Sequence, residues 1–169
     1  MSIFCGEGGS GRMVDRVAIG FESLFKSAVL PSYENVGDAG MDLRACFESD
    51  TIENWKKTVT IPPRGRVLIP TGLKMLIPIG YEGQVRSRSG MSLKKGVIVL
   101  NAPGTIDCGY RGEVGIILYN ASEQYVDIVH GDRIAQLVVA KCSEVVPYNC
   151  IVEPNTDRGE GGFGSTGVE

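Results

Sequence analysis

The sequence predicts a single all-β domain, with a distorted β-barrel or jelly-roll-like arrangement and at most one short helix. Short runs rich in Val and Ile recur along the chain, and Gly, Pro and Asn residues separate them. The 23 glycines and 8 prolines imply many turns between short elements. No long segment has a helical period, which favours a β-sandwich or barrel. At 169 residues, we expect one domain that buries a substantial core.

The first half of the chain contains short candidate strands separated by turn residues. The segment 14–21 alternates loosely and is a candidate first strand, whereas Pro31 forces an extended segment. The polar segment 47–57 is expected to be a surface excursion. Candidate strands here are the end of 35–45, then Val59–Ile61, Gly65–Pro70 and Leu73–Ile77.

The second half contains the one predicted helix and a predicted hairpin. Ser87–Lys95 has room for a short helix before Gly96. The apolar runs Val97–Leu100 and Val114–Tyr119 are predicted to be two strands of a hairpin. Further strands are expected at Gln124–Val129 and Arg133–Ala140, around the turn 130–132, and in the apolar part of Lys141–Val152.

Three regions are predicted from composition. Residues 1–13 are glycine-rich and expected to be a flexible N-terminal arm. Residues 14–152 form the β-domain. Residues 153–169 are polar and glycine-rich, and we expect them to form a flexible C-terminal tail.

Charge and cysteine content exclude several classes of function. The net charge of −3, without a polybasic block, argues against nucleic acid or a membrane surface as partner. No apolar run approaches the roughly eighteen residues of a membrane span, and the N-terminus lacks a signal-peptide layout. The five scattered cysteines, without a CxxC pair, predict reduced thiols in the cytoplasm or another reducing compartment.

The stretch 86–120 carries the strongest functional signal. Its RSRSG segment sets Arg88 beside small residues, which suits an anion. The hairpin can present main-chain groups to a flat, polar ligand. Asp107 is a candidate general base beside the anion loop, and alternatively a turn acid. Tyr110 is either a packed strand residue or a platform for a ligand.

Asp42, Asp132 and His130 are polar side chains outside that stretch. Asp42 could cap a local turn or contact the water shell of a metal ion. Arg88 could pair with Asp132 at the surface, an interaction of little energetic value. His130, the single histidine, is assigned to its turn, because a metal site needs several ligands.

The tail segment 158–167 is a second candidate anion site. Its glycines permit positive φ, so backbone N–H groups near Ser165 and Thr166 can line a concavity for an anion. Arg158 would supply the charge, and the ring of Phe163 could stack on a base. The alternative is an ordinary frayed terminus.

Five segments, in order, resemble the five motifs of the trimeric all-β dUTPase family (deoxyuridine 5′-triphosphate nucleotidohydrolase). Five ordered matches are highly specific, and they span the chain from about residue 15 onward. The segments are AGMDLRA (Ala39–Ala45), RSRSGMS (Arg86–Ser92), NAPGTIDCGYRG (Asn101–Gly112), GDRIAQLVV (Gly131–Val139) and RGEGGFGSTG (Arg158–Gly167).

The resemblance implies hydrolysis of dUTP to dUMP and pyrophosphate, which limits uracil incorporation into DNA and supplies dUMP for thymidylate synthesis. Asp107 would activate the water that attacks the α-phosphorus, with Mg²⁺ held by substrate phosphates and water rather than directly by the protein. Asp42 and Asp132 would support the site. By the same resemblance the substrate-binding residues are Arg88, Ser89, Gly90, Asn101, Thr105, Ile106, Tyr110, Gly115, Gln136, Arg158, Phe163, Gly164, Ser165 and Thr166.

Within these roles, the resemblance implies that main-chain groups of the hairpin bind uracil. The Tyr110 ring would pack under the deoxyribose, and Phe163 of the closing tail would cover the base. The family forms homotrimers in which each site draws on three chains. Two departures are modest: Gly109 stands where the family often has a second acid, and Met41 replaces a frequent aromatic residue.

Two alternative functions remain compatible with the sequence. A dCTP deaminase-like enzyme of the same fold would share the nucleotide pocket but release ammonia from dCTP. A non-catalytic regulatory protein would keep the pocket and signal by closure of the tail.

Overall fold

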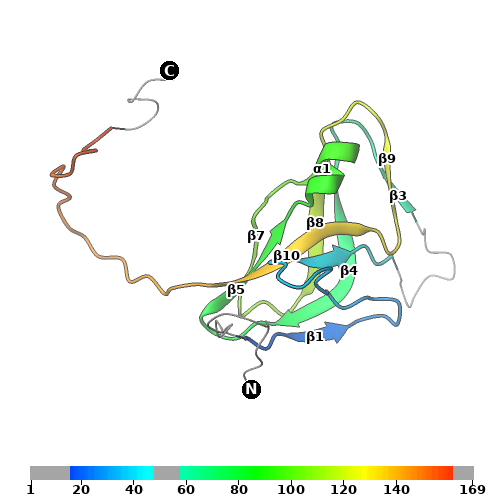
Figure 1. Ribbon diagram of the computed structural model, residues 1–169, viewed down its shortest axis with the longest axis horizontal. Coiled ribbons are helices and arrows are strands. Elements are labelled where there is room, and N and C mark those ends of the chain that lie inside the picture. The colour runs from blue at the N-terminus through cyan, green and yellow to red at the C-terminus, as the bar shows by residue number, and fades with distance from the viewer. Residues whose placement is uncertain (1–15, 48–57, 162–169) are drawn as a thin grey trace, which may run out of the picture.

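The computed structural model describes residues 16–47 and 58–161, which form three antiparallel sheets and one short helix (Figure 1). The first sheet has the order β1-β4-β8-β6. Its strands are β1 (Gly20–Ser23), β4 (Arg66–Leu76), β8 (Glu113–Asn120) and β6 (Val97–Val99). The pairing of β6 with β8 confirms the predicted hairpin, and Val99 lies opposite Leu118.

The second sheet, of order β2-β10-β5-β7, carries four of the predicted site residues, Asp42, Thr105, Ile106 and Gln136. The two remaining strands pair with each other. The described strands form open sheets, and a closed barrel is not seen among them. The prediction of a single all-β domain with one short helix is confirmed. The strands are β2 (Met41–Arg44), β10 (Arg133–Lys141), β5 (Tyr81–Arg86), β7 (Gly104–Ile106), β3 (Thr58–Ile61) and β9 (Val126–Val129).

One hydrophobic core joins the sheets. Along β8 the residues Val114, Ile116 and Leu118 are buried, whereas the residues between them are exposed or half-buried. This alternation follows from the period of two in a strand. Asn120 ends the strand, fully buried, and its side-chain amide donates to the carbonyl groups of Ile61 and Gln124 at 3.0 and 2.7 Å. A polar side chain is therefore buried with its hydrogen bonds made.

Helix α1 (Ser89–Lys95) lies where the sequence predicts it. It ends at Gly96, which adopts a left-handed φ of 65° and donates its N–H to the carbonyl of Ser92 at 3.1 Å. Glycine adopts this conformation without a steric cost. Met91 buries its side chain in the core, so the helix is anchored and the residues around Arg88 are held at its start.

The structure differs from the predicted elements in several places. The candidate strands 65–70 and 73–77 form one strand, β4, with a register shift between Pro70 and Lys74. Strands β5 and β7 were not predicted, because each is short and flanked by Gly or Pro. The first strand begins at Gly20 and overlaps only the end of 14–21.

The expected strand within Lys141–Val152 is wrong. The last strand ends at Lys141, and residues 142–152 form no regular element. Beyond β10 the chain runs away from the sheets as an extended segment (Figure 1). The predicted arm 1–13 and most of the surface excursion 47–57 lie outside the described residues. Phe47 itself is buried.

The four cysteines in the described ranges are free: Cys46, Cys108, Cys142 and Cys150. Among the residues with described structure, no helix is long and apolar enough to cross a membrane.

Candidate active site

Two hollows of the β-domain are lined by the predicted site residues. The first, here called the anion hollow, has a volume of about 380 Å³ and gathers residues from the AGMDLRA, RSRSGMS and GDRIAQLVV segments, which are far apart in the sequence. Its lining residues are Glu34, Asn35, Asp38, Ala39, Gly40, Asp42, Arg88, Ser89, Gly90, Arg133 and Gln136.

Asp42 organises the two arginines of the anion hollow. On β2, its carboxylate accepts from Arg88 Nε at 2.7 Å and from Arg133 Nη1 at 3.1 Å. The Asp42 side chain is only 15% exposed, so these charge-assisted bonds are partly shielded from water. Arg88 also donates from Nη1 to the Arg133 carbonyl at 3.2 Å. One carboxylate thus fixes both guanidinium groups at one edge of the hollow.

The suggested surface pairing of Arg88 with Asp132 is wrong. Asp132 instead closes the turn before β10, where its carboxylate accepts from the Val129 N–H at 3.0 Å. Its role is local, because the turn needs an acceptor close in sequence. His130, in the same turn, accepts from the Phe47 N–H at its Nδ1 atom, at 3.1 Å.

Gln136 holds the anion loop from β10. Its side-chain amide donates to the Ser87 carbonyl at 2.8 Å. The hydroxyl of Ser87 accepts from the Val99 N–H at 2.8 Å, so the loop is tied to β6 as well. Gly40 packs against Gln136 so closely that a Cβ there would overlap the Gln136 amide oxygen. Ser89 is exposed at the start of α1, within this scaffold.

The second hollow, here called the hairpin hollow, lies between β7 and β8 and has a volume of about 190 Å³. It contains the predicted base and the predicted sugar platform. Its lining residues are Thr105, Ile106, Asp107, Tyr110, Glu113, Val114 and Gly115.

The ring of Tyr110 is fixed although it is 46% exposed. Its hydroxyl donates to the Glu113 carbonyl at 2.9 Å, and its N–H donates to the Asp107 carbonyl at 3.0 Å. Gly112 lies directly against the ring, where a Cβ would stand 2.6 Å from Tyr110 Cζ. The ring therefore forms a rigid wall of the hollow.

Asp107 follows β7 directly and is exposed. Within the described ranges, its carboxylate makes no hydrogen bond or ion pair, and it faces the hairpin hollow together with Tyr110. An uncommitted carboxylate of this kind can accept a proton from water. Asn101 is also exposed, but it does not line the hollow.

The anion hollow and the hairpin hollow share no lining residue. Arg158, the one predicted tail residue in the described ranges, is exposed and donates from Nε to the Gly161 carbonyl at 3.0 Å. The described segment beyond β10, residues 142–161, runs away from the sheets (Figure 1). Phe163, Gly164, Ser165 and Thr166 lie outside the described residues.

Sequence reasoning missed several residues of the site, among them Arg133, Glu34 and Ser87. Arg133 and Glu34 both line the anion hollow, and Ser87 ties its loop to β6. Arg133 stands within the GDRIAQLVV segment and Ser87 within RSRSGMS, so their motif positions were the available signal. No such signal marks Glu34, whose position depends on a turn next to β2.

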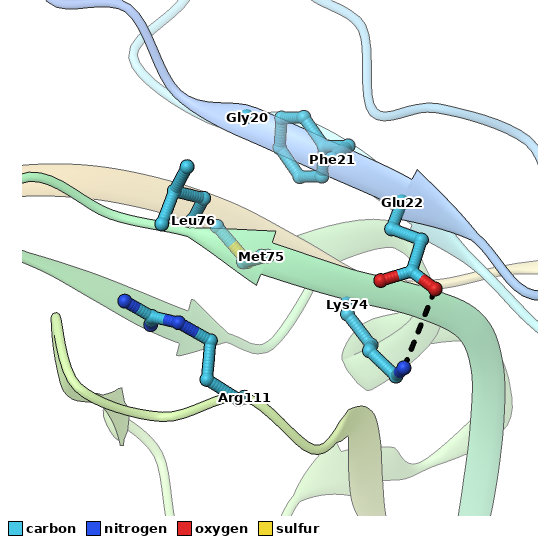
Figure 2. Close-up of a pocket in the computed structure, with 7 residues that line it drawn as sticks. All are labelled: Gly20, Phe21, Glu22, Lys74, Met75, Leu76 and Arg111. Carbon is cyan, nitrogen blue, oxygen red and sulfur yellow. Dashed lines mark hydrogen bonds and ion pairs between the residues drawn. The ribbon is translucent and has the colours of Figure 1, made fainter.

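A third hollow, whose lining surface is mostly apolar although Glu22, Lys74 and Arg111 border it, contains none of the predicted site residues (Figure 2). It lies beside β1 and β4 and has a volume of about 380 Å³. Phe21, Met75 and Leu76 line it, and Glu22 pairs with Lys74 across the two strands at 3.3 Å.

Comparison with known proteins agrees with the motif order. The family model for dUTPase matches residues 26–167. The deoxyuridine 5′-triphosphate nucleotidohydrolase of Desulfotalea psychrophila is 53% identical over 140 residues, covering 82% of this chain and 87% of that protein.

Solved structures give the same result. A Staphylococcus bacteriophage 80alpha dUTPase with dUpNHpp has a TM-score of 0.74 and 28% identity, covering 89% of this chain and 99% of that one. A mutant dUTPase of phage phi11 of S. aureus, which coordinates a structural Mg(II) ion, has a TM-score of 0.64 and 26% identity, covering 81% and 97% of the two chains. The chain belongs to the dUTPase family.

Proposed function

We propose that this chain hydrolyses dUTP to dUMP and pyrophosphate, with deoxyuridine in the hairpin hollow and phosphates in the anion hollow. The observation that carries the proposal is the pairing of an uncommitted carboxylate, Asp107, with a rigid tyrosine wall in one hollow. A second hollow supplies two fixed guanidinium groups. Phosphoryl transfer requires positioning and charge neutralisation above all, and this arrangement offers both.

The nucleoside is selected by shape. Main-chain groups of Thr105, Ile106 and Gly115 line the hairpin hollow and bind the edge of uracil. Asn101 supports the hairpin from outside it. The Tyr110 ring packs under deoxyribose, and its fixed position leaves no room for a 2′-hydroxyl. This wall favours deoxyribonucleotides over ribonucleotides.

Asp107 acts as the general base. It accepts a proton from water, whose oxygen forms a bond with the α-phosphorus while the bond to the bridging oxygen of the β-phosphate breaks, and pyrophosphate leaves. Arg88, Ser89 and Gly90 bind phosphates, and Gln136 holds their loop in place. Asp42 keeps Arg88 directed at one edge of the hollow. Asp132 supports β10 through its turn.

Magnesium fits this site as an ion carried by the substrate. In the described ranges, no three His, Cys, Asp or Glu side chains are grouped to hold a metal. Asp42 is already bound by two arginines, so phosphate oxygens and water are the natural ligands. When bound, Mg²⁺ neutralises phosphate charge. The likeness to a phage phi11 dUTPase with a structural Mg(II) ion supports the choice of metal.

We propose that the working form is a homotrimer whose sites each draw on three chains. The two hollows share no residue, which supports a site completed by a second copy. The segment 142–152 also exposes a run of apolar side chains, which soluble monomers rarely do. Val145, Val146, Tyr148, Ile151 and Val152 are each more than three-quarters exposed.

The tail is the third contribution to the site. Arg158, Gly164, Ser165 and Thr166 bind phosphates of a neighbouring site, and Phe163 covers uracil. The departure of the described tail from its own sheets supports this assignment (Figure 1). The free cysteines favour the cytoplasm or another reducing compartment.

The activity is tested by incubation with each dNTP and with UTP in the presence of Mg²⁺. Pyrophosphate release from dUTP alone is expected. Ammonia release from dCTP would establish a deaminase instead, and binding without turnover would establish a regulatory protein.

Site sharing is tested by co-expression of Asp107→Asn with Arg88→Ala. If a site takes these residues from different chains, randomly mixed trimers regain about a quarter of wild-type activity. If both residues act within one chain, every site carries a defect and the mixture stays inactive. Light scattering on the same sample measures the mass of the assembly.

A further inference from the structure

The charge of the anion hollow is unusual for a phosphate site. Three carboxylates line it, Glu34, Asp38 and Asp42, against two guanidinium groups, Arg88 and Arg133. A hollow that receives several negatively charged phosphates is thus itself negative by one charge. Asp42 has a structural reason to be there, because it fixes both arginines. Asp38 also has one, because its carboxylate accepts from the Asn35 N–H at 2.8 Å and closes a turn.

Glu34 has no such reason. Its carboxylate accepts from Arg133 Nη1 at 3.0 Å, the same nitrogen that donates to Asp42 at 3.1 Å. Arg133 is therefore already held in place without it. The Glu34 side chain is 66% exposed, compared with 15% for Asp42, so its ion pair alone contributes little stability.

The ion pair between Glu34 and Arg133 is exposed, so another anion can take the place of the Glu34 carboxylate. Glu34 stands directly before the turn 35–38, in which Gly37 has a φ of 92°. A phosphate oxygen approaching Arg133 is chemically equivalent to the Glu34 carboxylate, since both are anions that accept from a guanidinium. A phosphate that enters the hollow must displace Glu34 or bind beside its negative charge.

We infer that Glu34 is an affinity-setting residue, which competes with phosphate groups for Arg133 and weakens the hold of the site on pyrophosphate. The inference rests on the proposed function, in which the anion hollow receives the phosphate chain. Glu34 acts on bound phosphates whether or not the bond has been cleaved. It therefore changes KM and product inhibition, and it leaves the chemical step unchanged.

The test is a charge series at this position, Glu34→Gln and Glu34→Lys. The measurements are binding of magnesium pyrophosphate by calorimetry and its inhibition constant during dUTP turnover. Removing the charge is expected to tighten pyrophosphate about two- to fivefold, the range for one exposed charge pair. Glu34→Lys tightens it further, and KM for dUTP falls in the same order.

The matched control is Glu22→Gln. Glu22 is also a carboxylate in an exposed ion pair, 64% exposed, but it lines the apolar hollow of Figure 2. Pyrophosphate binding by this variant should equal wild type. The effect at position 34 should also shrink in about 1 M salt, where the screening length is about 3 Å. A purely structural effect would persist there.

The outcomes separate this inference from the function beneath it. If wild type hydrolyses dUTP and binds pyrophosphate, but Glu34→Gln binds it no more tightly at low salt, the inference on Glu34 is overturned and the proposed function stands. If wild type binds no pyrophosphate, the assignment of the anion hollow fails and this inference fails with it. Pyrophosphate binding that tightens from wild type through Glu34→Gln to Glu34→Lys, and does so less at high salt, supports both the inference on Glu34 and the proposed function.

Discussion

Replacement of Asp107 by Asn separates catalysis from folding more cleanly than any other change in this chain. The side chain is exposed, and within the described ranges it makes no hydrogen bond or ion pair. Asn has nearly the same shape but cannot accept a proton from water at neutral pH. The loss of a general base is expected to lower kcat about 10²- to 10⁴-fold. Stability should change by no more than about 0.5 kcal/mol, as for an exposed position without partners.

The assay follows pyrophosphate release under saturating dUTP and, separately, binding of dUpNHpp by calorimetry. Affinity for this analogue should stay within about threefold of wild type, since no binding contact is removed. The melting temperature should move by only about 1–2 °C, as expected for so small a change in a chain of this size.

The matched control is Asp127→Asn, on β9. This acid is also exposed, it accepts from Thr60 Oγ1 at 2.6 Å, and it does not line the hairpin hollow. Its turnover should equal wild type. If Asp107→Asn keeps a rate within about threefold of wild type, far above the range for a lost general base, then Asp107 is not the base. A large drop in melting temperature would show that the carboxylate has a structural partner instead.

Three further predictions concern the rest of the site. Asp42→Asn leaves the guanidinium groups of Arg88 and Arg133 without a shared negative partner, so we expect a loss of about 1–3 kcal/mol in unfolding free energy. We also expect kcat/KM to fall more than tenfold. Thermal unfolding and steady-state kinetics measure the two effects, and an unchanged kcat/KM would refute the role of Asp42. Tyr110→Phe keeps the ring and should keep the preference for dUTP over UTP, whereas Tyr110→Ala should lose much of it; equal preferences in the two variants would contradict the ring as the sugar wall. Truncation before Arg158 should leave a folded assembly with the same number of chains by light scattering and with severely reduced turnover. A full rate would return the tail to an ordinary frayed terminus.

Local sequence was sufficient for several elements. The helix at Ser89–Lys95 could be predicted, because Gly96 supplies the left-handed end that stops it. The hairpin could be predicted because apolar runs at Val97 and Val114 alternate with turn residues. The family assignment followed from five ordered motifs, and the matched model confirms it. The helix and each single motif are signalled within a few neighbouring residues, and the hairpin and the family follow from the order of such segments along the chain.

Other elements could not be predicted, because their partners are distant in sequence. The strand β7 is only three residues long, and it forms because Gly83, Gln84 and Val85 of β5 offer it an edge. Within Lys141–Val152 the opposite error occurred, because the apolar composition predicted a strand that the structure does not contain. There the chain has no strand beside it to pair with, and its side chains remain exposed.

The sequence by itself determined the all-β class and the short helix, and it predicted which side chains are candidates to bind an anion and activate water. Only the tertiary structure decided which of them meet. Asp42 reaches Arg88 and Arg133 across separations of 46 and 91 residues, whereas the suggested Arg88–Asp132 pair does not form. Glu34 meets Arg133 in the anion hollow, although the two are 99 residues apart in the sequence. Side-chain chemistry is local, but contact between charges depends on which strands share a sheet, and that depends on how the whole core packs.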